Sequence, residues 1–274
     1  VSKFEASSNV PAATSGGGND TALYVKSLPN VNSWRGINIG NAFTVSRNME
    51  KNTIYGWGTS GKGIDTHMMK NSEWGAVAYL TQSTYGKNSE VFKNNSTTHI
   101  TGCASSSSDT YNPYEGCQYT YNTTNGWNAS TSGTIHGIYD MSGGREWVAA
   151  YINNANQELG LNGSPIINAS DKYKDIYTIE SSENEISNYA LTINKKGDAV
   201  YETSISYPIN SYEEDQIAWF DDQAAIPYNS EPWFDRGGTC YDITGTGIFN
   251  FFKSFGDSNS AVGFRAVIVV NGGL

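Results

Sequence analysis

Residues 231–252 read EPWFDRGGTCYDITGTGIFNFF, and their side chains suit three kinds of chemistry. Glu231, next to Pro232, suits a carboxylate ligand for calcium beside a bound sugar. Cys240, close behind an Arg-Gly-Gly triplet, suits an oxidising thiol or a soft-metal ligand. The aromatic and amide side chains of 248–252 suit direct contact with a ligand. The segment is therefore a candidate for catalysis, for metal-assisted sugar binding, or for the display of contact residues.

The chain has three cysteines, Cys103, Cys117 and Cys240, so at most one internal disulfide can form. Cys103 and Cys117 flank a loop rich in Ser, Asn and Tyr, and a bridge between them would stabilise the fold by roughly 3 kcal/mol. Their spacing matches no zinc motif. Two interpretations stay open at this point: a disulfide between these two residues, or two free thiols.

The other catalytic and metal-binding residue types are scattered along the chain. His67, His99 and His136 fall in three separate segments, which favours surface or capping roles over catalysis. The acidic groups at 213–215 and 221–222 offer carboxylates of the kind that calcium prefers, but neither has EF-hand spacing. We therefore expect no enzymatic activity, no metal and no cofactor.

Composition limits the classes of partner. The 274 residues carry a formal charge of −10, from 17 basic and 27 acidic residues, with no cluster of Lys and Arg. Nucleic acid and anionic membranes are therefore disfavoured. No apolar run approaches the ~18–20 residues that span a bilayer, so we expect no membrane insertion. The start, VSKFEASSNV, does not read as a signal peptide, and we expect an upstream segment that was either processed away or left out of this sequence.

The elements that must position these residues are short. Residues 23–43 read as short extended pieces. The segment 65–86 predicts the first helix, capped by Asp65 or Thr66. Residues 87–133 are polar and rich in glycine, which predicts a long surface excursion. A short strand at 138–139 is then followed by a predicted second helix through Trp147, Val148 and Tyr151.

The rest of the chain predicts an irregular polar stretch over 153–230 and a buried central strand over 262–270, VGFRAVIVV, which is rich in β-branched residues. No internal repeat or linker is visible, so residues 1–274 are interpreted as one α+β domain. The expected core consists of Trp74, Val77, Trp147, Phe264, Val267 and Val269.

Four segments together resemble a known family. They are SKFE (2–5), MMKNSEWGAVAYL (68–80), GIYDMSGGREWV (137–148) and the tail WFDRGG…GIFNF…VGFRAVIVV (233–270). In this order they resemble the C-type lectin fold, in the branch of formylglycine-generating enzymes and the variable proteins of diversity-generating retroelements, and in particular surface proteins of gut Firmicutes and their phages. The resemblance implies two helices on a small twisted antiparallel sheet, closed by SKFE against the terminal strand.

The resemblance also bears on chemistry. Oxidases of this branch need a cysteine pair near the R-G-G segment, and here Asp242 and the run 245–247 stand at the matching positions. The calcium-dependent lectins need E-P-N or Q-P-D with W-N-D, whereas Glu231-Pro232 is followed by Trp233. Glu231-Pro232 is better explained as the start of a strand after a turn.

The variable proteins of this branch display changeable side chains on the strands after R-G-G. Gly237, Gly238, Gly245 and Gly247 permit tight turns there. Alternation within IFNFF predicts that residues 248, 250 and 252 point outward. The expected ligand-binding face consists of Asp235, Tyr241, Asp242, Thr244, Asn250, Phe252 and Lys253.

The resemblance therefore implies a non-enzymatic recognition domain, an adhesin or a phage receptor-binding protein, at a bacterial cell surface or on a virion. Its ligand would be a protein or a glycan, bound by 235–255 with 87–133 shaping the face. The alternatives are a structural pilus, envelope or phage-tail component, and a calcium-dependent lectin. We expect that replacing Tyr241, Asn250 and Phe252 by Ala abolishes binding and leaves stability nearly unchanged.

Overall fold

The computed structural model describes residues 1–11, 15–57, 63–109, 111–153, 158–178, 195–206, 217–242 and 245–270. Within these ranges the chain is mixed α and β, with three α-helices and several small sheets, in keeping with the α+β class. The helices are α1 (Ile39–Asn48), α2 (Asn71–Gln82) and α3 (Glu158–Ile167). None of the described helices has the length and apolar character needed to cross a bilayer.

The largest sheet is built around one strand, β6 (Glu146–Asn153). On one edge β6 pairs antiparallel with β10 (Trp233–Arg236), which in turn pairs with β11 (Phe251–Ser254). On the other edge β12 (Gly263–Phe264) and β7 (Asp175–Thr178) pair with opposite ends of β6, both in the parallel direction. The expected purely antiparallel sheet is therefore wrong, and the sheet is mixed.

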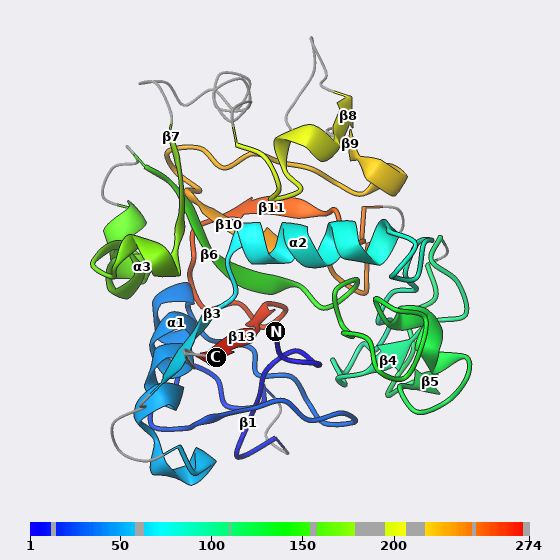
Figure 1. The fold of residues 1–274 in the computed structure, drawn as a ribbon, viewed down its shortest axis with the longest axis horizontal. Coiled ribbons are helices and arrows are strands. Elements are labelled where there is room, and N and C mark those ends of the chain that lie inside the picture. The colour runs from blue at the N-terminus through cyan, green and yellow to red at the C-terminus, as the bar shows by residue number, and fades with distance from the viewer. Residues whose placement is uncertain are drawn as a thin grey trace.

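The strand β6 separates two hydrophobic cores. Its alternate side chains point to opposite faces, as the period of a strand requires. One face packs with α1 and α3, and the other with α2. In Figure 1, α2 crosses β6, while α1 and α3 lie together at the left of the view. The residues on the α1 and α3 side are Trp147, Ala149 and Tyr151, and those on the α2 side are Val148, Ala150 and Ile152.

The predicted second helix through Trp147 is thus wrong, because this segment is β6. A strand covered on both faces reads as a continuous apolar run, which periodicity cannot distinguish from a buried helix. The short strand predicted at 138–139 is absent from the described structure. The helix predicted over 65–86 begins only at Asn71, and β3 (Ile64–Met68) precedes it.

The last strand, β13 (Ala266–Val270), pairs antiparallel with β3 in a two-stranded sheet. It is therefore not a central strand, and Val269, an expected core residue, is 41% exposed. Val77 is only partly buried, whereas the other four expected core residues are buried. These four are Trp74, Trp147, Phe264 and Val267.

The first residues close the fold, although SKFE itself is not a strand. The backbone N–H groups of Ser2 and Ala6 donate to the carbonyls of Ala266 (3.1 Å) and Phe264 (2.8 Å). Residues 2–6 therefore lie beside residues 264–266, as the sequence predicted for the first and last strands (Figure 1). The nearest strand, β1 (Ser7–Ser8), pairs with β2 (Val25–Lys26).

The segment 87–133 is less superficial than expected. It contains the strand pair β4 (Cys103–Ala104) and β5 (Tyr119–Thr120), and its residues 93–96 and 101, 103–105 are buried. Polar side chains are buried there because they hydrogen-bond to backbone groups. In the stretch 153–230, predicted to be irregular, the structure places α3, β7 and the pair β8 (Ser204–Ser206) and β9 (Ile217–Ala218).

Candidate ligand-binding face

A tight turn follows β10 and carries Tyr241 at its tip. Gly237 and Gly238 have φ values of 88° and 63°, a region that favours glycine. Asp242 Oδ2 accepts hydrogen bonds from the backbone N–H and the hydroxyl of Thr239, both at 2.9 Å, and these close the turn. Tyr241 is 48% exposed, and its side chain is presented by a fixed backbone.

A small hollow lies on one side of this turn. Its volume is about 160 Å³, below the roughly 300–1,000 Å³ of typical ligand pockets. Arg145 forms a bidentate ion pair with the buried Asp235, with distances of 2.8 Å (Nε–Oδ1) and 2.6 Å (Nη2–Oδ2), and lies over the ring of Phe252. Such a space accepts one side chain or a small polar group. The lining residues are Arg145, Gln223, Asp235, Gly238, Thr239, Asp242, Asn250 and Phe252.

A wider hollow, of about 520 Å³, includes Tyr241 in its wall. Since Asp242 lines the first hollow and Tyr241 lines the second, the turn stands between the two. The residues lining the second hollow are Ser15, Asn32, Arg35, Thr97, Thr98, His99, Tyr241, Ser260 and Ala261. They come from five separate parts of the chain, so only folding assembles this hollow.

The excursion 87–133 supplies one wall of the wider hollow and also holds the turn. Lys93 Nζ donates to the carbonyl of Asp242 at 2.8 Å, and the hydroxyl of Tyr241 donates to the carbonyl of Thr97 at 3.5 Å. His99 has a φ of 55°, and its carbonyl accepts from the N–H of Ser33 at 3.0 Å. The expectation that this excursion shapes the face agrees with these contacts.

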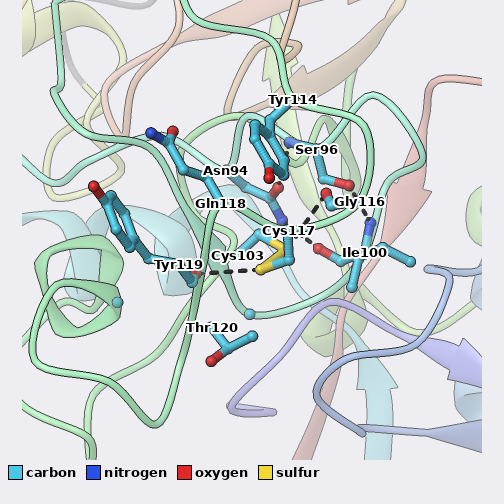
Figure 2. Close-up of a disulfide and its surroundings, with 12 residues drawn as sticks. Asn94, Ser96, Ile100, Cys103, Tyr114, Gly116, Cys117, Gln118, Tyr119 and Thr120 are labelled. Atoms are coloured by element: carbon cyan, nitrogen blue, oxygen red, sulfur yellow. Dashed lines mark hydrogen bonds between the residues drawn. A yellow bond between two sulfur atoms is a disulfide. The ribbon is translucent and has the colours of Figure 1, made fainter.

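A disulfide between Cys103 and Cys117 anchors that wall (Figure 2). The Cα atoms of the two cysteines are 5.2 Å apart, and the alternative of two free thiols is wrong. Nearby, Asn94 Nδ2 donates to the carbonyl of Ile100 at 2.8 Å, and the N–H of Ile100 donates to Ser96 Oγ at 3.0 Å. These bonds close the turn 96–100 that presents Thr97, Thr98 and His99 to the hollow.

The two basic side chains of the wider hollow, His99 and Arg35, differ in their charge at physiological pH. Burial and the neighbouring Arg35 guanidinium lower the pKa of His99 to about 4, so its imidazole is neutral at physiological pH. Arg35 is only 7% exposed, and its Nη1 donates to the carbonyl of Ser260. Burial lowers the pKa of Arg35, and Glu5 opposes this shift. A guanidinium nevertheless stays protonated at physiological pH.

The structure brings five of the seven predicted face residues to the two hollows. Asp235, Asp242, Asn250 and Phe252 line the first, and Tyr241 lines the second. Thr244 lies outside the described residues. Lys253 is buried, so its assignment to the exposed binding face is wrong.

The misassignment of Lys253 follows from sheet register. Lys253 stands opposite Phe234, whose ring is in the α2-side core, whereas Phe252 stands opposite Asp235 on the other face. The Lys253 side chain is buried, with Nζ 3.9 Å from Glu231 Oε2 and 4.6 Å from the centre of the Tyr228 ring.

The predicted alternation of 248, 250 and 252 is also wrong. Ile248 and Asn250 are each 2% exposed, Phe252 is half-buried, and the intervening Phe249 is buried as well. Residues 248–249 form a turn, and β11 begins only at residue 251, so the two-residue period of a strand does not apply. Asn250 is held inside by Nδ2, which donates to the carbonyl of Gly245 at 2.6 Å.

Sequence inspection missed the residues that come to the hollows from distant segments. Arg145 lies 90 positions before its partner Asp235, and Arg35 lies 225 positions before Ser260. The one signal for Arg145 was its place inside the GIYDMSGGREWV motif, next to the strand that pairs with β10. Arg35, in SWRGIN, carried no signal beyond an isolated charge among neutral residues.

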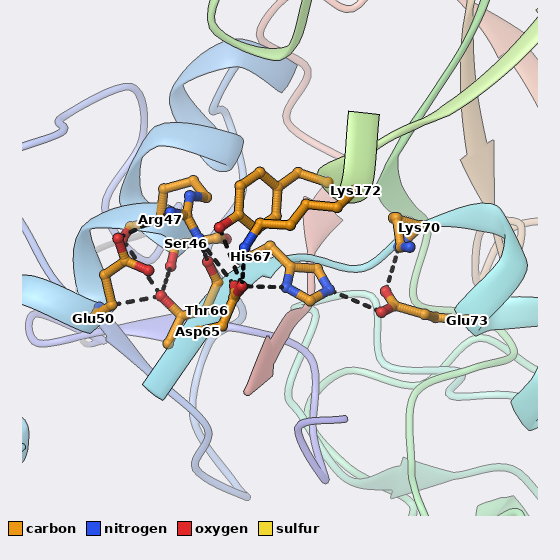
Figure 3. Close-up of polar contacts among 10 residues, drawn as sticks. Ser46, Arg47, Glu50, Asp65, Thr66, His67, Lys70, Glu73 and Lys172 are labelled. Atoms are coloured by element: carbon orange, nitrogen blue, oxygen red, sulfur yellow. Dashed lines mark hydrogen bonds and ion pairs between the residues drawn. The ribbon is translucent and has the colours of Figure 1, made fainter. Parts of the chain in front are cut away.

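The candidate catalytic side chains Cys240, His67 and His136 differ in burial and in their partners. Cys240 is buried, and burial together with Asp242 raises the pKa of its thiol to about 11, which disfavours the thiolate. His67 lies in β3, with Nε2 2.8 Å from Glu73 Oε1 and Nδ1 3.5 Å from Asp65 Oδ1 (Figure 3). It is buried rather than at a helix start. His136 is exposed.

Of the acidic groups considered for calcium, 213–215 and 221–222, only the second lies within the described residues. Asp222 is buried and accepts from the N–H of Phe249 at 2.8 Å. Glu231-Pro232 directly precedes β10, as predicted. In the part of the chain that the structure describes, no three His, Cys, Asp or Glu side chains are grouped so as to hold a metal ion.

No family model matches the sequence, and no curated protein matches it either.

Proposed function

We propose that this chain is a non-enzymatic recognition domain with a C-type lectin-like fold, of the kind found in variable proteins of diversity-generating retroelements and in surface adhesins. It binds a protein or glycan on another cell, from a bacterial surface or a phage virion. The binding face is the turn 239–242 with the two hollows that flank it.

The observation that carries the proposal is the setting of Tyr241. Its ring is half exposed on a turn that glycines shape and that Asp242 and Lys93 hold in place. A tyrosine offers a large contact area and loses little conformational entropy on binding, which is why binding loops favour it. Such a fixed aromatic ridge between two hollows suits recognition by contact.

A second observation supports the fold. Glu146 lies in the GIYDMSGGREWV motif and Arg265 in the terminal GFR motif, two of the segments on which the resemblance depends. The two side chains form a fully buried ion pair with distances of 2.5 Å (Nη2–Oε1) and 3.2 Å (Nε–Oε2). The two motifs are therefore joined in the interior, where β12 pairs with β6.

The test is binding of the fluorescently labelled chain to arrays of glycans and of extracellular proteins. Tyr241→Ala is expected to lower the signal of the bound ligands at least tenfold, because a central aromatic anchor commonly contributes 2 kcal/mol or more, on the order of thirtyfold in affinity. Thermal melting is expected to stay nearly unchanged. Asn250 does not suit this test, since its burial makes Asn250→Ala a change in stability.

The matched control is Tyr85→Ala, which removes a tyrosine that is 89% exposed and lines neither hollow. It should leave array binding unaltered. Equal losses for both variants, or binding by Tyr241→Ala at full strength, would place the ligand elsewhere on the molecule.

A further inference from the structure

We infer that the wider hollow beside Tyr241 binds an acidic sugar, a pyranose ring that carries a carboxylate, at the end of a glycan chain. This inference deepens the proposed function and rests on it, because Tyr241 belongs both to the proposed binding face and to the wall of the wider hollow. It adds a ligand class and names Arg35 as the residue that selects it.

The charge of the hollow is the first step. The chain as a whole carries −10, yet none of the described residues that line this hollow is acidic. Arg35 is the cation in this lining, and His99 is neutral because its pKa is about 4. The hollow is therefore a positive site on an acidic molecule, and it favours an anionic ligand over a neutral or cationic one.

The position of Arg35 is the second step. Its backbone N–H donates to the carbonyl of Ser15 at 2.8 Å, and Nη1 donates to the carbonyl of Ser260. Both ends of the residue are thus fixed before a ligand arrives, and the guanidinium is largely removed from water. Charge-assisted hydrogen bonds are strongest in such settings, and the planar guanidinium matches a carboxylate.

The neutral lining is the third step. Hydroxyl and amide side chains line the hollow together with Arg35. Thr97 Oγ1 donates to the carbonyl of Tyr114 and Thr98 Oγ1 accepts from the N–H of Gly116. A hydroxyl group can both donate and accept, so each retains hydrogen-bonding capacity for a ring with several hydroxyl groups. The Tyr241 ring stands beside them and offers an apolar surface to the C–H face of a sugar. The volume of about 520 Å³ lies within the range of roughly 300–1,000 Å³ typical of ligand sites. The polar lining residues are Ser15, Asn32, Thr97, Thr98 and Ser260.

This lining favours a sugar over the other carriers of a carboxylate. A peptide C-terminus would bring a carboxylate but no ring of hydroxyl groups to pair with the Ser, Thr and Asn side chains of the wall. A phosphate would be served by Arg35 equally well, but it would leave the Tyr241 ring without a partner. The combination of one guanidinium, many hydroxyl groups and one aromatic ring is matched by a hydroxylated ring with one acidic group.

The experiment is calorimetric titration of the chain with N-acetylneuraminic acid and glucuronic acid, beside glucose, acetate and inorganic phosphate. Binding of at least one acidic sugar, at least tenfold tighter than glucose, acetate or phosphate, is the expected result. Arg35→Gln should remove this preference, and Arg35→Lys should retain only part of it, because lysine lacks the planar fork.

Two further variants guard against unfolding as the cause. Ala261→Phe fills the hollow without removing any side-chain hydrogen bond, and it should abolish acidic-sugar binding while leaving the melting temperature nearly unchanged. Lys172→Gln removes an exposed positive charge outside the hollow, from a side chain 58% exposed, and should not alter binding.

Three results would overturn the inference: equal affinity for glucose and the acidic sugars, tighter binding of phosphate or acetate, or an acidic-sugar affinity that survives both Arg35→Gln and Ala261→Phe. Array binding that depends on Tyr241, found together with any of these results, would leave the proposed function standing with a different ligand. Loss of Tyr241 dependence would instead place the ligand elsewhere on the molecule and so remove the proposed binding face.

Discussion

Three carboxyl side chains meet one another behind the binding face. Glu5, Asp140 and Glu146 are all buried, and Arg265 pairs with Glu146. Asp140 accepts three hydrogen bonds, from the N–H groups of Glu5 and Gly102 and from an asparagine amide. Burial, together with the nearby carboxylates of Glu146 and Asp140, raises the pKa of Glu5 well above its usual range. Glu5 is therefore the member of this group that retains a proton as pH rises.

Replacement of Glu5 by Gln should change how stability depends on pH. Because the pKa of Glu5 is raised in the folded state, the unfolded chain loses this proton first, at about pH 4.3. Stability is then lost as pH rises from there toward the raised pKa. Glu5→Gln cannot ionise, so it should match the native chain in thermal melts at about pH 4 and exceed it at about pH 8.

The control is Glu115→Gln, which removes a carboxyl from an exposed position. Its melting curve should follow the native one at both pH values. A Glu5→Gln variant that is less stable than the native chain at about pH 8 would show that Glu5 is ionised in the fold.

At the scale of elements, two helical glycines differ in their surroundings. A Cβ on Gly75 of α2 would lie 2.4 Å from the backbone of Asp198, whereas a Cβ on Gly160 of α3 would meet nothing within 4 Å. In a free helix both changes to alanine are favourable by ~1 kcal/mol. Close packing of α2 against 197–198 therefore requires glycine, and α3 has no such requirement.

These two substitutions should act in opposite directions. Gly75→Ala should lower the free energy of unfolding by about 1–3 kcal/mol, since overpacking outweighs helix propensity. Gly160→Ala should raise it by about 0.5–1 kcal/mol. Urea unfolding measures both changes, and each variant serves as the control for the other. Stabilisation by Gly75→Ala would mean that α2 does not pack against 197–198.

Some helices, strands and core positions could be predicted from the sequence and others could not. The core positions of Trp74 and Trp147, the strand start at Glu231-Pro232 and the contact between the chain ends follow from residue type and motif. The identity of β6 does not, because it is covered on both faces and shows neither period. The helix α1 was hidden by INIGNAF, in which Gly40 packs against α3.

The candidate site also has parts that could be predicted from the sequence and parts that could not. The turn that presents Tyr241 is encoded locally, by two glycines and a nearby aspartate, and was predicted. The inward orientation of Asn250 and Lys253 was not predicted, because it depends on where β11 begins and on which residue of β10 each one faces. Arg35 and Arg145 join the face only through contacts across the chain.

At the scale of the whole molecule, one covalent bond holds the excursion that completes the face. The Cys103–Cys117 disulfide closes a segment that is polar throughout, with little apolar area of its own to bury. Side-chain hydrogen bonds and the disulfide add to a small hydrophobic cluster there, which contains Ala104 and Ala129. Disulfides persist in oxidising surroundings, which agrees with the proposed location on a cell surface or a virion.

Removal of this disulfide should lower both stability and ligand binding. The sequence separation of 14 predicts a loss of about 3 kcal/mol in the free energy of unfolding for the double variant Cys103→Ser with Cys117→Ser. Acidic-sugar binding should weaken as well, because Thr97, Thr98 and His99 lose their anchored support. Urea unfolding and calorimetric titration measure the two effects.

Treatment with a reductant is the control. It should lower stability and binding in the native chain and change neither in the double variant. If unfolding is unchanged by reductant, the excursion is held by its hydrogen bonds alone. The wall of the wider hollow would then be independent of the bridge.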